Sequence, residues 1–443
     1  MRIRLESVGC RLNIGEIEAF GRRLSRLGQC VVADGAEAEL IILNTCAVTA
    51  TAARKSRHLI RQLRRRNPEA RFVVTGCLAE LDAEQVADLG IDLVVGNDDK
   101  DDLVDRLVAG GLLRATSAGE AAAEPEAGSF PGRTRAFLKV QDGCDNRCAF
   151  CIVTRARGRG RSRPASEVVR DVRELVRAGY VEVVLSGVHL GSWGHDLGQP
   201  GGLEDLVRTL LTDTGLPRLR LSSLEPWDLD EGFFALFEDR RLLPHLHLPL
   251  QSGCDATLAR MARRTTLEDY RALLVAARRA VPDLAVSTDV MVAFPGETDA
   301  EFETSLAAVE ELAFSRLHVF RYSRRPGTPA AAMPDQVPRT AAAERSARMQ
   351  ALGERLSDRF HRAHLGRRLP VLWESWRSRG RRRRWSGLSD NYIRVFADTG
   401  SEVELSNHVT EVELEGCSTE GMTGRIADGV QPAFVSPTLP VVP

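Results

Sequence analysis

The first 114 residues alternate between short, continuous apolar runs and segments whose apolar residues recur with helical spacing. The continuous runs, rich in Val, Ile and Leu, predict strands at residues 2–8, 39–43, 71–75 and 92–95. The helical spacing predicts helices between them, at residues 15–27 and 52–66. Because alternating strands and helices are typical of a parallel sheet, we predict an N-terminal, doubly wound α/β domain at residues 1–114.

A second alternating series follows residues 115–133, whose Ala-, Gly-, Glu- and Pro-rich composition predicts a linker. Six strands are predicted, at residues 136–140, 182–185, 218–221, 246–250, 285–292 and 316–320. Helices are predicted at residues 166–178, 203–212, 229–238, 267–280 and 299–312. Six such repeats predict a partial (β/α)6 barrel, which occupies residues 134–365 together with a long helix near its end.

The last part of the chain predicts a third unit and a tail. Four short strands separated by turn residues are predicted, at residues 370–376, 393–397, 402–405 and 411–415. They predict a small antiparallel β-barrel over residues 366–428. Four prolines among residues 429–443 predict a disordered tail. The length of 443 residues agrees with about three domains.

The overall composition excludes several protein classes. A hydrophobic fraction of 43% and a charged fraction of 27% exclude wholesale disorder. No apolar run approaches the ~18 residues of a membrane span, and residues 1–10 lack a signal-peptide core, so we expect a cytoplasmic protein with no membrane partner. The formal net charge of −1 argues, taken alone, against a nucleic-acid partner.

The chain has nine cysteines, which in a reducing compartment are more typical of metal ligands or catalytic groups than of disulfides. Cys144, Cys148 and Cys151 form a C-x3-C-x2-C motif just after the first predicted barrel strand, where barrel enzymes build active sites. Zinc usually takes four ligands from two paired motifs, and no second pair lies nearby. A 4Fe–4S cluster on three thiolates keeps one iron open for reaction. We therefore predict an open cluster here, with zinc and unliganded thiols as the alternatives.

Three further cysteines each follow a predicted strand of the N-terminal domain: Cys10, Cys46 and Cys77. Because the carboxyl ends of parallel strands share one edge of a sheet, we predict that these thiols converge there. A free cysteine is also a common core residue, but three in the same structural position favour a second three-thiolate site. The other three are interpreted as packing residues: Cys30, Cys254 and Cys417.

Of the 60 basic residues only three are lysines, and arginines form clusters that suit phosphate recognition. Four share one face of the predicted helix at residues 52–66: Arg54, Arg57, Arg61 and Arg65. Others recur every second residue after Cys151, on one side of an extended backbone, and include Arg155, Arg157 and Arg159. A third cluster is interleaved with tryptophans that suit base stacking, and includes Arg381, Arg382, Arg383 and Trp385. We predict RNA binding, with solvated charged surfaces as the alternative; acidic residues at 80–105 account for the small net charge.

The segment DGCDNRCAFC at residues 142–151 resembles the radical S-adenosylmethionine signature, with Phe150 at its aromatic position. Together with the N-terminal cysteine triad it resembles the methylthiotransferases, and residues 366–428 are similar to their TRAM RNA-binding domain. Three stretches resemble the branch that modifies N6-threonylcarbamoyladenosine beside the anticodon of tRNA: residues 44–57, 156–164 and 186–198.

The resemblance implies two 4Fe–4S clusters, one on Cys144, Cys148 and Cys151 and an auxiliary one on Cys10, Cys46 and Cys77 that carries or supplies sulfur. S-adenosylmethionine then serves as source of the 5′-deoxyadenosyl radical and as methyl donor, and the product carries a methylthio group at C2 of the adenine. No catalytic residue beyond the cluster ligands is implied. Candidate contacts of S-adenosylmethionine are Phe150, Gly187, Glu225, Gln251 and Gly296, each of which also fits a turn or a helix cap.

Other substrates are known within this family, and they define the alternatives. Related branches modify N6-isopentenyladenosine in tRNA or an aspartate of a ribosomal protein. A non-catalytic, metal-containing RNA-binding protein is the alternative from another class. The expected partners are tRNA and an unidentified one-electron donor; the sulfur source is unknown, and the protein is expected to be a monomer. His245 and His247 alternate on a barrel strand and are interpreted as structural histidines.

Overall fold

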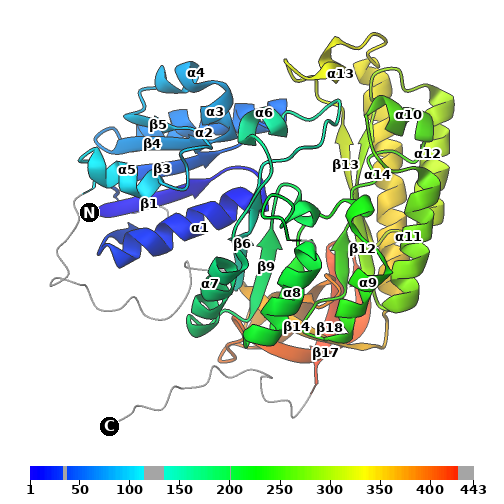
Figure 1. The fold of residues 1–443 in the computed structure, drawn as a ribbon. Coiled ribbons are helices and arrows are strands. Elements are labelled where there is room, and N and C mark those ends of the chain that lie inside the picture. Colours follow the sequence, from blue (N-terminus) through cyan, green and yellow to red (C-terminus); the bar gives the residue numbers. More distant parts are fainter. Residues whose placement is uncertain (33–36, 114–133, 200, 428–443) are drawn as a thin grey trace.

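The computed structural model describes residues 1–32, 37–113, 134–199 and 201–427, and the predicted linker and tail lie outside these ranges. Figure 1 shows three units: an N-terminal α/β domain, a central open barrel beside it, and a small β-barrel beneath the central one. In this described part of the chain, no helix is both long and apolar enough to cross a membrane.

The N-terminal domain contains a five-stranded parallel sheet of order β2-β1-β3-β4-β5. Its strands are β1 (Arg2–Ser7), β2 (Cys30–Val32), β3 (Leu40–Thr45), β4 (Arg71–Gly76) and β5 (Leu93–Val95). Its helices are α1 (Arg11–Arg26), α2 (Ala50–Arg66), α3 (Cys77–Leu81), α4 (Ala83–Ala87) and α5 (Leu103–Ala109). The predicted parallel α/β domain is therefore confirmed. Strand β2 was not predicted.

The three cysteines outside the two triads have different environments. Cys254 is buried, and Cys417 packs against the core of the C-terminal barrel, which confirms the interpretation of both as packing residues. Cys30 is exposed on the edge strand β2. Its interpretation as a packing residue was wrong. Strand β2 was not predicted, so the exposure of Cys30 at the edge of the sheet was not predicted either.

Six parallel strands form the central unit, in two sheets of order β10-β9-β6 and β11-β12-β13. They are β6 (Arg135–Lys139), β9 (Glu182–Ser186), β10 (Arg218–Leu221), β11 (His245–His247), β12 (Ala285–Val292) and β13 (Arg316–Arg321). Parallel bridges between Leu219 and Leu242 and between Ser223 and His247 join the two sheets. The predicted partial barrel is confirmed, with β6 and β13 as its outer strands.

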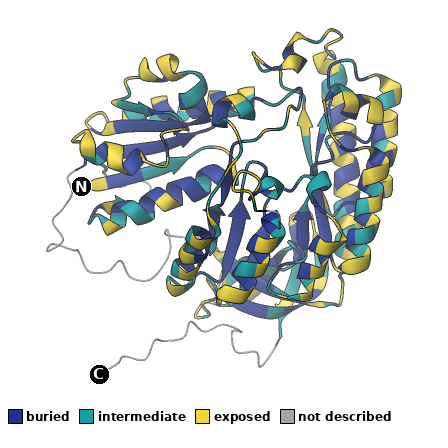
Figure 2. Cartoon of the chain, viewed as in Figure 1, coloured by how far each residue is buried: buried dark blue, intermediate teal, exposed yellow. Residues whose placement is uncertain are grey.

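Helices cover the outside of this barrel, and in Figure 2 their outward faces are exposed, while strands such as β9 and β10 are buried. They are α7 (Ala165–Arg177), α8 (Gly202–Asp213), α9 (Glu231–Phe234), α10 (Asp255–Arg260), α11 (Leu267–Ala280), α12 (Asp299–Leu312), α13 (Pro329–Ala332) and α14 (Arg339–Arg362). Thr266 and Thr298 begin α11 and α12 with reciprocal capping boxes, which satisfy amides that a helix start leaves unpaired. Between β6 and α7 lie two short strands and one short helix: β7 (Gln141–Asp142), α6 (Val153–Arg157) and β8 (Arg161–Ser162).

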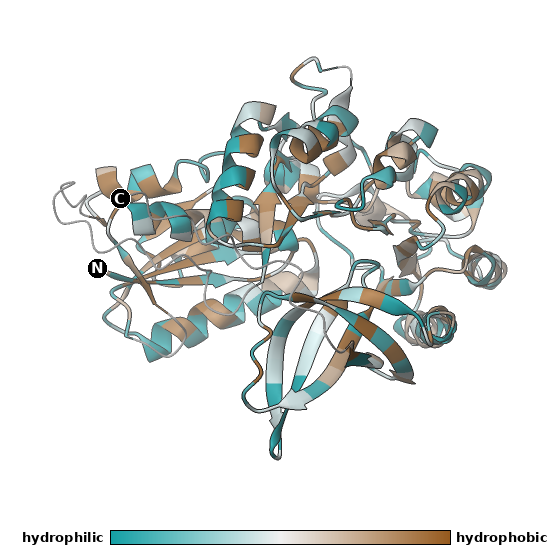
Figure 3. Cartoon of the chain, turned by 90° about the horizontal axis from the view of Figure 1, so that it is seen from below, coloured by the Kyte–Doolittle hydropathy of each residue, from teal (hydrophilic) through white to brown (hydrophobic). Residues whose placement is uncertain are grey.

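The C-terminal unit is a closed five-stranded barrel of order β14-β15-β16-β18-β17, seen from below in Figure 3. Its strands are β14 (Arg368–Arg379), β15 (Arg382–Ser389), β16 (Arg394–Gly400), β17 (Val409–Ser418) and β18 (Gly421–Ile426). The predicted small barrel is confirmed with two corrections. Residues 402–405 form no strand, and β16 pairs with β18 in parallel rather than antiparallel orientation.

A buried ion-pair group fixes the base of the central barrel. Glu182 on β9 is fully buried, and its carboxylate accepts hydrogen bonds from Arg218 at 3.1 Å and from Arg220 at 2.7 Å, both on β10. Burial favours the neutral acid, but the guanidiniums outweigh it and lower the pKa of Glu182 from 4.5 to about 2. The pairing therefore contributes stability above pH 4.5 that is lost as the pH falls toward 2.

Replacing Glu182 by Gln is expected to destabilise the protein by about 3–5 kcal/mol, because two buried guanidiniums lose their counter-charge. Urea unfolding at neutral pH measures the change. The wild type is also expected to lose stability over the acidic window more steeply than the variant. Glu204→Gln, which breaks an exposed pair with Arg208, is the matched control and is expected to cost less than about 1 kcal/mol. Equal unfolding midpoints for the two variants would contradict this assignment.

Candidate functional site

The loop that carries Cys144, Cys148 and Cys151 lies after β6 and β7, at the carboxyl end of the first barrel strand. Two backbone amides point at sulfur atoms: Asn146 N lies 3.4 Å from Cys144 Sγ, and Val153 N lies 3.4 Å from Cys151 Sγ. Amide hydrogen bonds stabilise negative charge on an acceptor. The loop is therefore preorganised to hold anionic sulfur ligands.

An arginine that the sequence analysis did not identify lies beside this loop. The side chain of Arg263 is 2% exposed, and its Nη1 lies 3.8 Å from Cys148 Sγ. It forms an ion pair of 2.6 Å with Glu225 and lies over the ring of Trp227. Burial raises the pKa of the Cys148 thiol, and the guanidinium opposes that effect. Arg263 thus favours the thiolate form, and the 38 residues that separate it from Glu225 explain why sequence gave no signal for the pair.

A buried histidine lies on the other side of the loop. His189 Nε2 is 2.6 Å from Asp228 Oδ2, and its Nδ1 is 3.4 Å from Asn146 Nδ2. Burial opposes the charged form, but Asp228 and the thiol of Cys144 raise the pKa of His189 to about 10. A second positive charge therefore lies at the edge of the triad. The only signal in the sequence was its place in the stretch 186–198, which carried the family resemblance.

The N-terminal triad also lies at one edge of its sheet, as predicted. Strands β1, β3 and β4 are neighbours in the sheet. Cys46 directly follows β3, Cys77 directly follows β4, and Cys10 closely follows β1. Their thiols are close enough to interact electrostatically, since Cys10 and Cys77 both contribute to raising the pKa of Cys46. The hydroxyl of Ser56 on α2 bonds both the amide and the carbonyl of Cys46, at 3.1 and 2.9 Å. Residues 36 and 31 positions apart are thus brought to one site by strand order.

Glycine before two of these cysteines allows the close approach. Gly9 has a φ of 113°, and a Cβ there would lie 2.5 Å from the Cβ of Cys46. Gly76 has a φ of 98°, and a Cβ there would lie 2.3 Å from the carbonyl oxygen of Thr45. Because only glycine tolerates both the positive φ and the missing space, the Gly-Cys pairs bring the cysteine loops together.

The donor sets of both triads fit a 4Fe–4S cluster. Burial raises the pKa of Cys46 to about 11 and that of Cys151 to about 12, so both thiols stay protonated at neutral pH without a cation. Iron binds the thiolate, so metal binding releases these protons and orders the loops. In the described residues, no three His, Cys, Asp or Glu side chains surround one point as a single metal ion requires. A cluster makes a different demand, because three of its irons each take one thiolate and the fourth stays open.

The five candidate contacts of S-adenosylmethionine all lie near the carboxyl ends of barrel strands. Phe150 is half-buried with its ring edge-on to Phe294, 6.4 Å between centroids. Gly187 follows β9, and Gly296 follows β12 with a φ of 75°. Gln251 has a φ of 69° and exchanges backbone hydrogen bonds with β12. Glu225 is engaged by Arg263, so its carboxylate is not an unpaired contact group.

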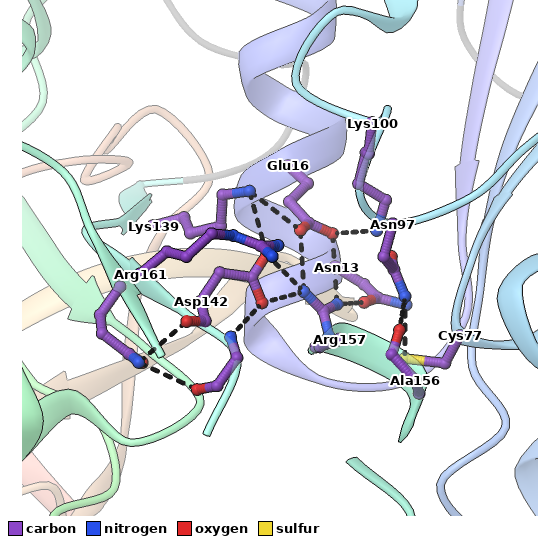
Figure 4. A network of polar contacts seen from close by, with 12 residues as sticks. Asn13, Glu16, Cys77, Asn97, Lys100, Lys139, Asp142, Ala156, Arg157 and Arg161 are labelled. Carbon is purple, nitrogen blue, oxygen red and sulfur yellow. Dashed lines mark hydrogen bonds and ion pairs between the residues drawn. The ribbon is translucent and has the colours of Figure 1, made fainter. Parts of the chain in front are cut away.

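The arginines after Cys151 do not share one side, and this prediction was wrong. Residues Val153–Arg157 form the helix α6, so spacing by two does not apply there. Arg155 and Arg159 are exposed, but Arg157 is 3% exposed and points into the protein, where it pairs with Glu16 and Asp142 (Figure 4). Arg157 is therefore removed from the RNA-binding candidates.

The face of α2 is basic, as the helical spacing indicated. Arg54, Arg61 and Arg65 are exposed, while Arg57 is half-buried with its guanidinium 3.8 Å from Asp82. The opposite face packs into the domain through Ile60 and Leu63. The helix thus presents three exposed guanidiniums on one face, with the half-buried Arg57 among them.

The C-terminal barrel carries the third basic cluster, but the prediction of Trp385 as its RNA-contacting tryptophan was wrong. Trp385 is fully buried and donates its indole N–H to Thr399, so it faces the barrel core and cannot stack on a base. Trp376 on the paired strand β14 is 42% exposed, and the guanidinium of Arg383 lies over its ring. Arg381 and Arg382 are exposed at the adjoining turn.

A groove runs along this face of the barrel. It has a volume of about 580 Å³. It is lined by Ser375, Trp376, Arg377, Arg384, Ser386, Arg394, Phe396, Ser418, Thr419 and Glu420. An exposed indole among guanidiniums suits a stacked base with its phosphates.

Two segments of the chain match known protein families. Residues 138–309 match the Radical SAM superfamily, and residues 2–96 match Uncharacterized protein family UPF0004. Among solved structures, the radical S-adenosylmethionine methyltransferase TsrM from Kitasatospora setae superposes with a TM-score of 0.52 at 17% identity, over 74% of each chain. This likeness concerns the fold.

Curated relatives are similar over nearly the whole chain. The threonylcarbamoyladenosine tRNA methylthiotransferase MtaB of Thermotoga maritima is 36% identical, over 97% of this chain and 98% of that protein. The protein of the same name from Bacillus subtilis is 36% identical over 89% of each chain. The tRNA-2-methylthio-N(6)-dimethylallyladenosine synthase of Novosphingobium aromaticivorans is also 36% identical, over 96% of this chain and 97% of that protein.

Proposed function

Because this chain belongs to the methylthiotransferase family of radical S-adenosylmethionine enzymes, we propose that it adds a methylthio group to C2 of N6-threonylcarbamoyladenosine in tRNA. The observation that carries the proposal is the pair of cysteine triads, each at the carboxyl edge of a parallel sheet and both in contact with α6. A protein that only bound RNA would need neither an open cluster site nor a second triad beside it.

Enzymes of this family use S-adenosylmethionine and 4Fe–4S clusters. When bound, these groups supply a 5′-deoxyadenosyl radical, which abstracts hydrogen from an unactivated carbon, together with sulfur and a methyl group. The protein's own residues hold and shield them. Cys144, Cys148 and Cys151 would hold the radical cluster, and Arg263 would balance its charge. Cys10, Cys46 and Cys77 would hold the auxiliary cluster in the neighbouring domain.

S-adenosylmethionine would bind over the carboxyl ends of the barrel strands, against Phe150 and near Gly187, Gln251 and Gly296. Positive-φ backbone at Gln251 and Gly296 turns the chain back at the strand ends, so backbone polar groups line that edge. Holding the radical source and the sulfur donor near one base converts a reaction of several partners into one of fixed geometry.

tRNA would contact the exposed arginines of α2, Arg155 and Arg159, and the groove of the C-terminal barrel. Replacing Trp376 by Ala is expected to weaken tRNA binding about 5- to 150-fold, since stacking on one base contributes about 1–3 kcal/mol. Filter binding or fluorescence anisotropy at fixed salt measures the affinity. Trp376→Phe keeps an aromatic face and is expected to retain most of it. Equal affinity of Trp376→Ala and wild type would exclude stacking at this site.

Nucleoside mass spectrometry of tRNA from a deletion strain tests the function. We expect 2-methylthio-N6-threonylcarbamoyladenosine to disappear and its precursor without the methylthio group to accumulate. Relatives named for either adenosine substrate are 36% identical to this chain, so the same spectra must include the 2-methylthio isopentenyl derivative. Loss of that nucleoside alone would assign the enzyme to the other branch.

Metal analysis tests the class of protein. About eight iron and eight sulfide per reconstituted chain are expected for two 4Fe–4S clusters, and zinc alone would leave the non-catalytic alternative. We further propose that the protein acts in the cytoplasm as a monomer, where tRNA and a one-electron donor of unidentified nature are its partners.

A further inference from the structure

The short helix α6 links the two cysteine triads. It begins at Val153, two residues after Cys151, and ends with Arg157, whose side chain enters the neighbouring domain. There the guanidinium contacts two residues of α1: Nη1 lies 3.0 Å from Glu16 Oε1, and Nη2 donates to Asn13 Oδ1 at 2.7 Å. The radical-cluster loop is thus tied by one short helix to the domain of the auxiliary triad.

Asn13 carries this contact to two of the auxiliary cysteine loops. Its Nδ2 donates to the carbonyl oxygens of Val8 at 2.8 Å and of Thr45 at 3.0 Å, and its Oδ1 lies 3.7 Å from the sulfur of Cys10. Val8 and Thr45 lie within two residues of Cys10 and Cys46. Arg157, by holding the oxygen of this amide, fixes the orientation in which Asn13 joins the two loops.

Asn97 makes the corresponding connection to the third cysteine. Its Nδ2 donates to the carbonyl oxygen of Ala156 and lies 3.9 Å from the sulfur of Cys77 (Figure 4). Ala156 and Arg157 are neighbours in α6. The last turn of this helix therefore contacts, through two asparagines, the loops of all three auxiliary cysteines.

The charges around Arg157 do not cancel. Five buried or nearly buried ionised groups form the cluster in Figure 4, and they are Glu16, Asp142, Arg157, Lys100 and Lys139. Three are cations and two are anions, which leaves one positive charge in excess; Asp101, which also pairs with Lys139, is 78% exposed to solvent. Burial of an excess charge is costly unless an opposite charge lies nearby.

The auxiliary triad would supply a nearby opposite charge once it holds a cluster. Although burial opposes the charged form, Glu16 and Asp142 raise the pKa of Arg157 well above its usual value, and Cys77 and Cys10 add to that effect. The amide oxygen of Asn13 lies between Arg157 and Cys10, 2.7 Å from the guanidinium nitrogen and 3.7 Å from the sulfur. Three thiolates and a cluster carry net negative charge, which increases by one on reduction.

We propose that Arg157 is the positioning residue of the auxiliary cluster: it fixes two of the cysteine loops through Asn13, and its charge stabilises the reduced cluster. The inference rests on the proposed function, which supplies the identity of the bound group. The same helix begins two residues after Cys151, so one short element contacts the loops of both triads.

The test is a redox titration of full-length, reconstituted enzyme with dithionite, followed by electron paramagnetic resonance of the auxiliary cluster. Added S-adenosylmethionine shifts the signal of the radical cluster and so separates the two. Arg157→Met is expected to make the reduced auxiliary cluster about tenfold less favourable, a shift of about 59 mV to more negative potential. Arg157→Lys keeps the charge and is expected to restore most of the shift.

Arg26→Met is the matched control. Arg26 lies at the other end of α1 and forms an exposed ion pair with Glu174 of the central barrel. The substitution therefore removes a guanidinium from the contact between the same two domains. It is expected to leave the potential unchanged. If Arg157→Met does not fold because Glu16 loses a partner, the double variant Arg157→Met/Glu16→Gln removes both charges. Loss of the Asn13 contact is then expected to change the electron paramagnetic resonance spectrum of the auxiliary cluster relative to wild type.

Two outcomes overturn different statements. A wild-type enzyme that holds two clusters and methylthiolates tRNA, with the potential and spectrum unchanged in Arg157→Met, refutes the role of Arg157 alone. A reconstituted wild type that holds no second cluster refutes the proposed function, and the inference with it.

Discussion

Replacing Cys148 by Ala is expected to abolish reductive cleavage of S-adenosylmethionine. Removing even an outer partner of a metal ligand commonly costs 10- to 100-fold, so loss of a ligand is expected to lower the rate more than about 100-fold. No other cysteine of the described chain lies in this loop to replace it, since Cys144 and Cys151 are the remaining thiols there. The measurement is 5′-deoxyadenosine formed by the reconstituted enzyme with dithionite.

The matched control is Cys417→Ala. Cys417 is a partly buried thiol of the C-terminal barrel, outside both triads, and its loss is expected to leave cleavage unchanged. The iron content of Cys148→Ala is expected to fall by about half, because one cluster is lost. Cleavage at the wild-type rate in Cys148→Ala would show that the radical chemistry belongs to another site.

Much of the fold could be predicted from local patterns, that is, from residues close together in the sequence. The alternation of apolar strands and helical segments predicted the parallel strands of the N-terminal domain and of the partial barrel, because buried parallel strands are commonly continuous apolar runs. The convergence of Cys10, Cys46 and Cys77 followed from the same rule, since strand ends meet at one edge whatever the sequence separation. Here a local pattern fixed a long-range contact.

The C-terminal barrel shows where that approach failed. Strand β15 begins with arginines at 382–384, and a run of cations has no apolar alternation by which to recognise a strand. Without the strand, the inward direction of Trp385 could not be inferred, and the tryptophan was placed at the surface. Trp376, on the exposed end of β14, is the tryptophan that can stack on a base, the role that was predicted for Trp385.

The contacts between domains were also beyond the sequence. Helix α6 has five residues, too few to show helical periodicity, so Arg157 was grouped with its exposed neighbours. Its partners Glu16 and Asn13 lie more than 140 residues away. Arg263 and Glu225 pair within the central barrel, but the 38 residues between them hid that contact in the same way. Pairing of charges across domains depends on three-dimensional placement, which a single sequence does not reveal.

Replacing Cys46 by Ala is expected to have a different effect from Cys148→Ala, and the difference tests whether the two centres are separate. Cys46 is 5% exposed, and its backbone is held by Ser56, so loss of the sulfur leaves the loop in place. The radical triad keeps its three thiols, and the formation of 5′-deoxyadenosine is expected to continue. Methylthiolation is expected to fall more than about 100-fold, because the sulfur-bearing cluster lacks a ligand.

Mass spectrometry of tRNA incubated with the Cys46→Ala enzyme measures the product, and 5′-deoxyadenosine is measured in the same reaction. Uncoupled cleavage, with radical formed and no methylthio group added, is the expected signature. Loss of both activities would instead mean that the auxiliary triad is needed to assemble the radical site. The contacts of α6 with both sites give a physical route for such dependence. The Cys46→Ala variant therefore shows whether the radical site assembles when the auxiliary triad is incomplete.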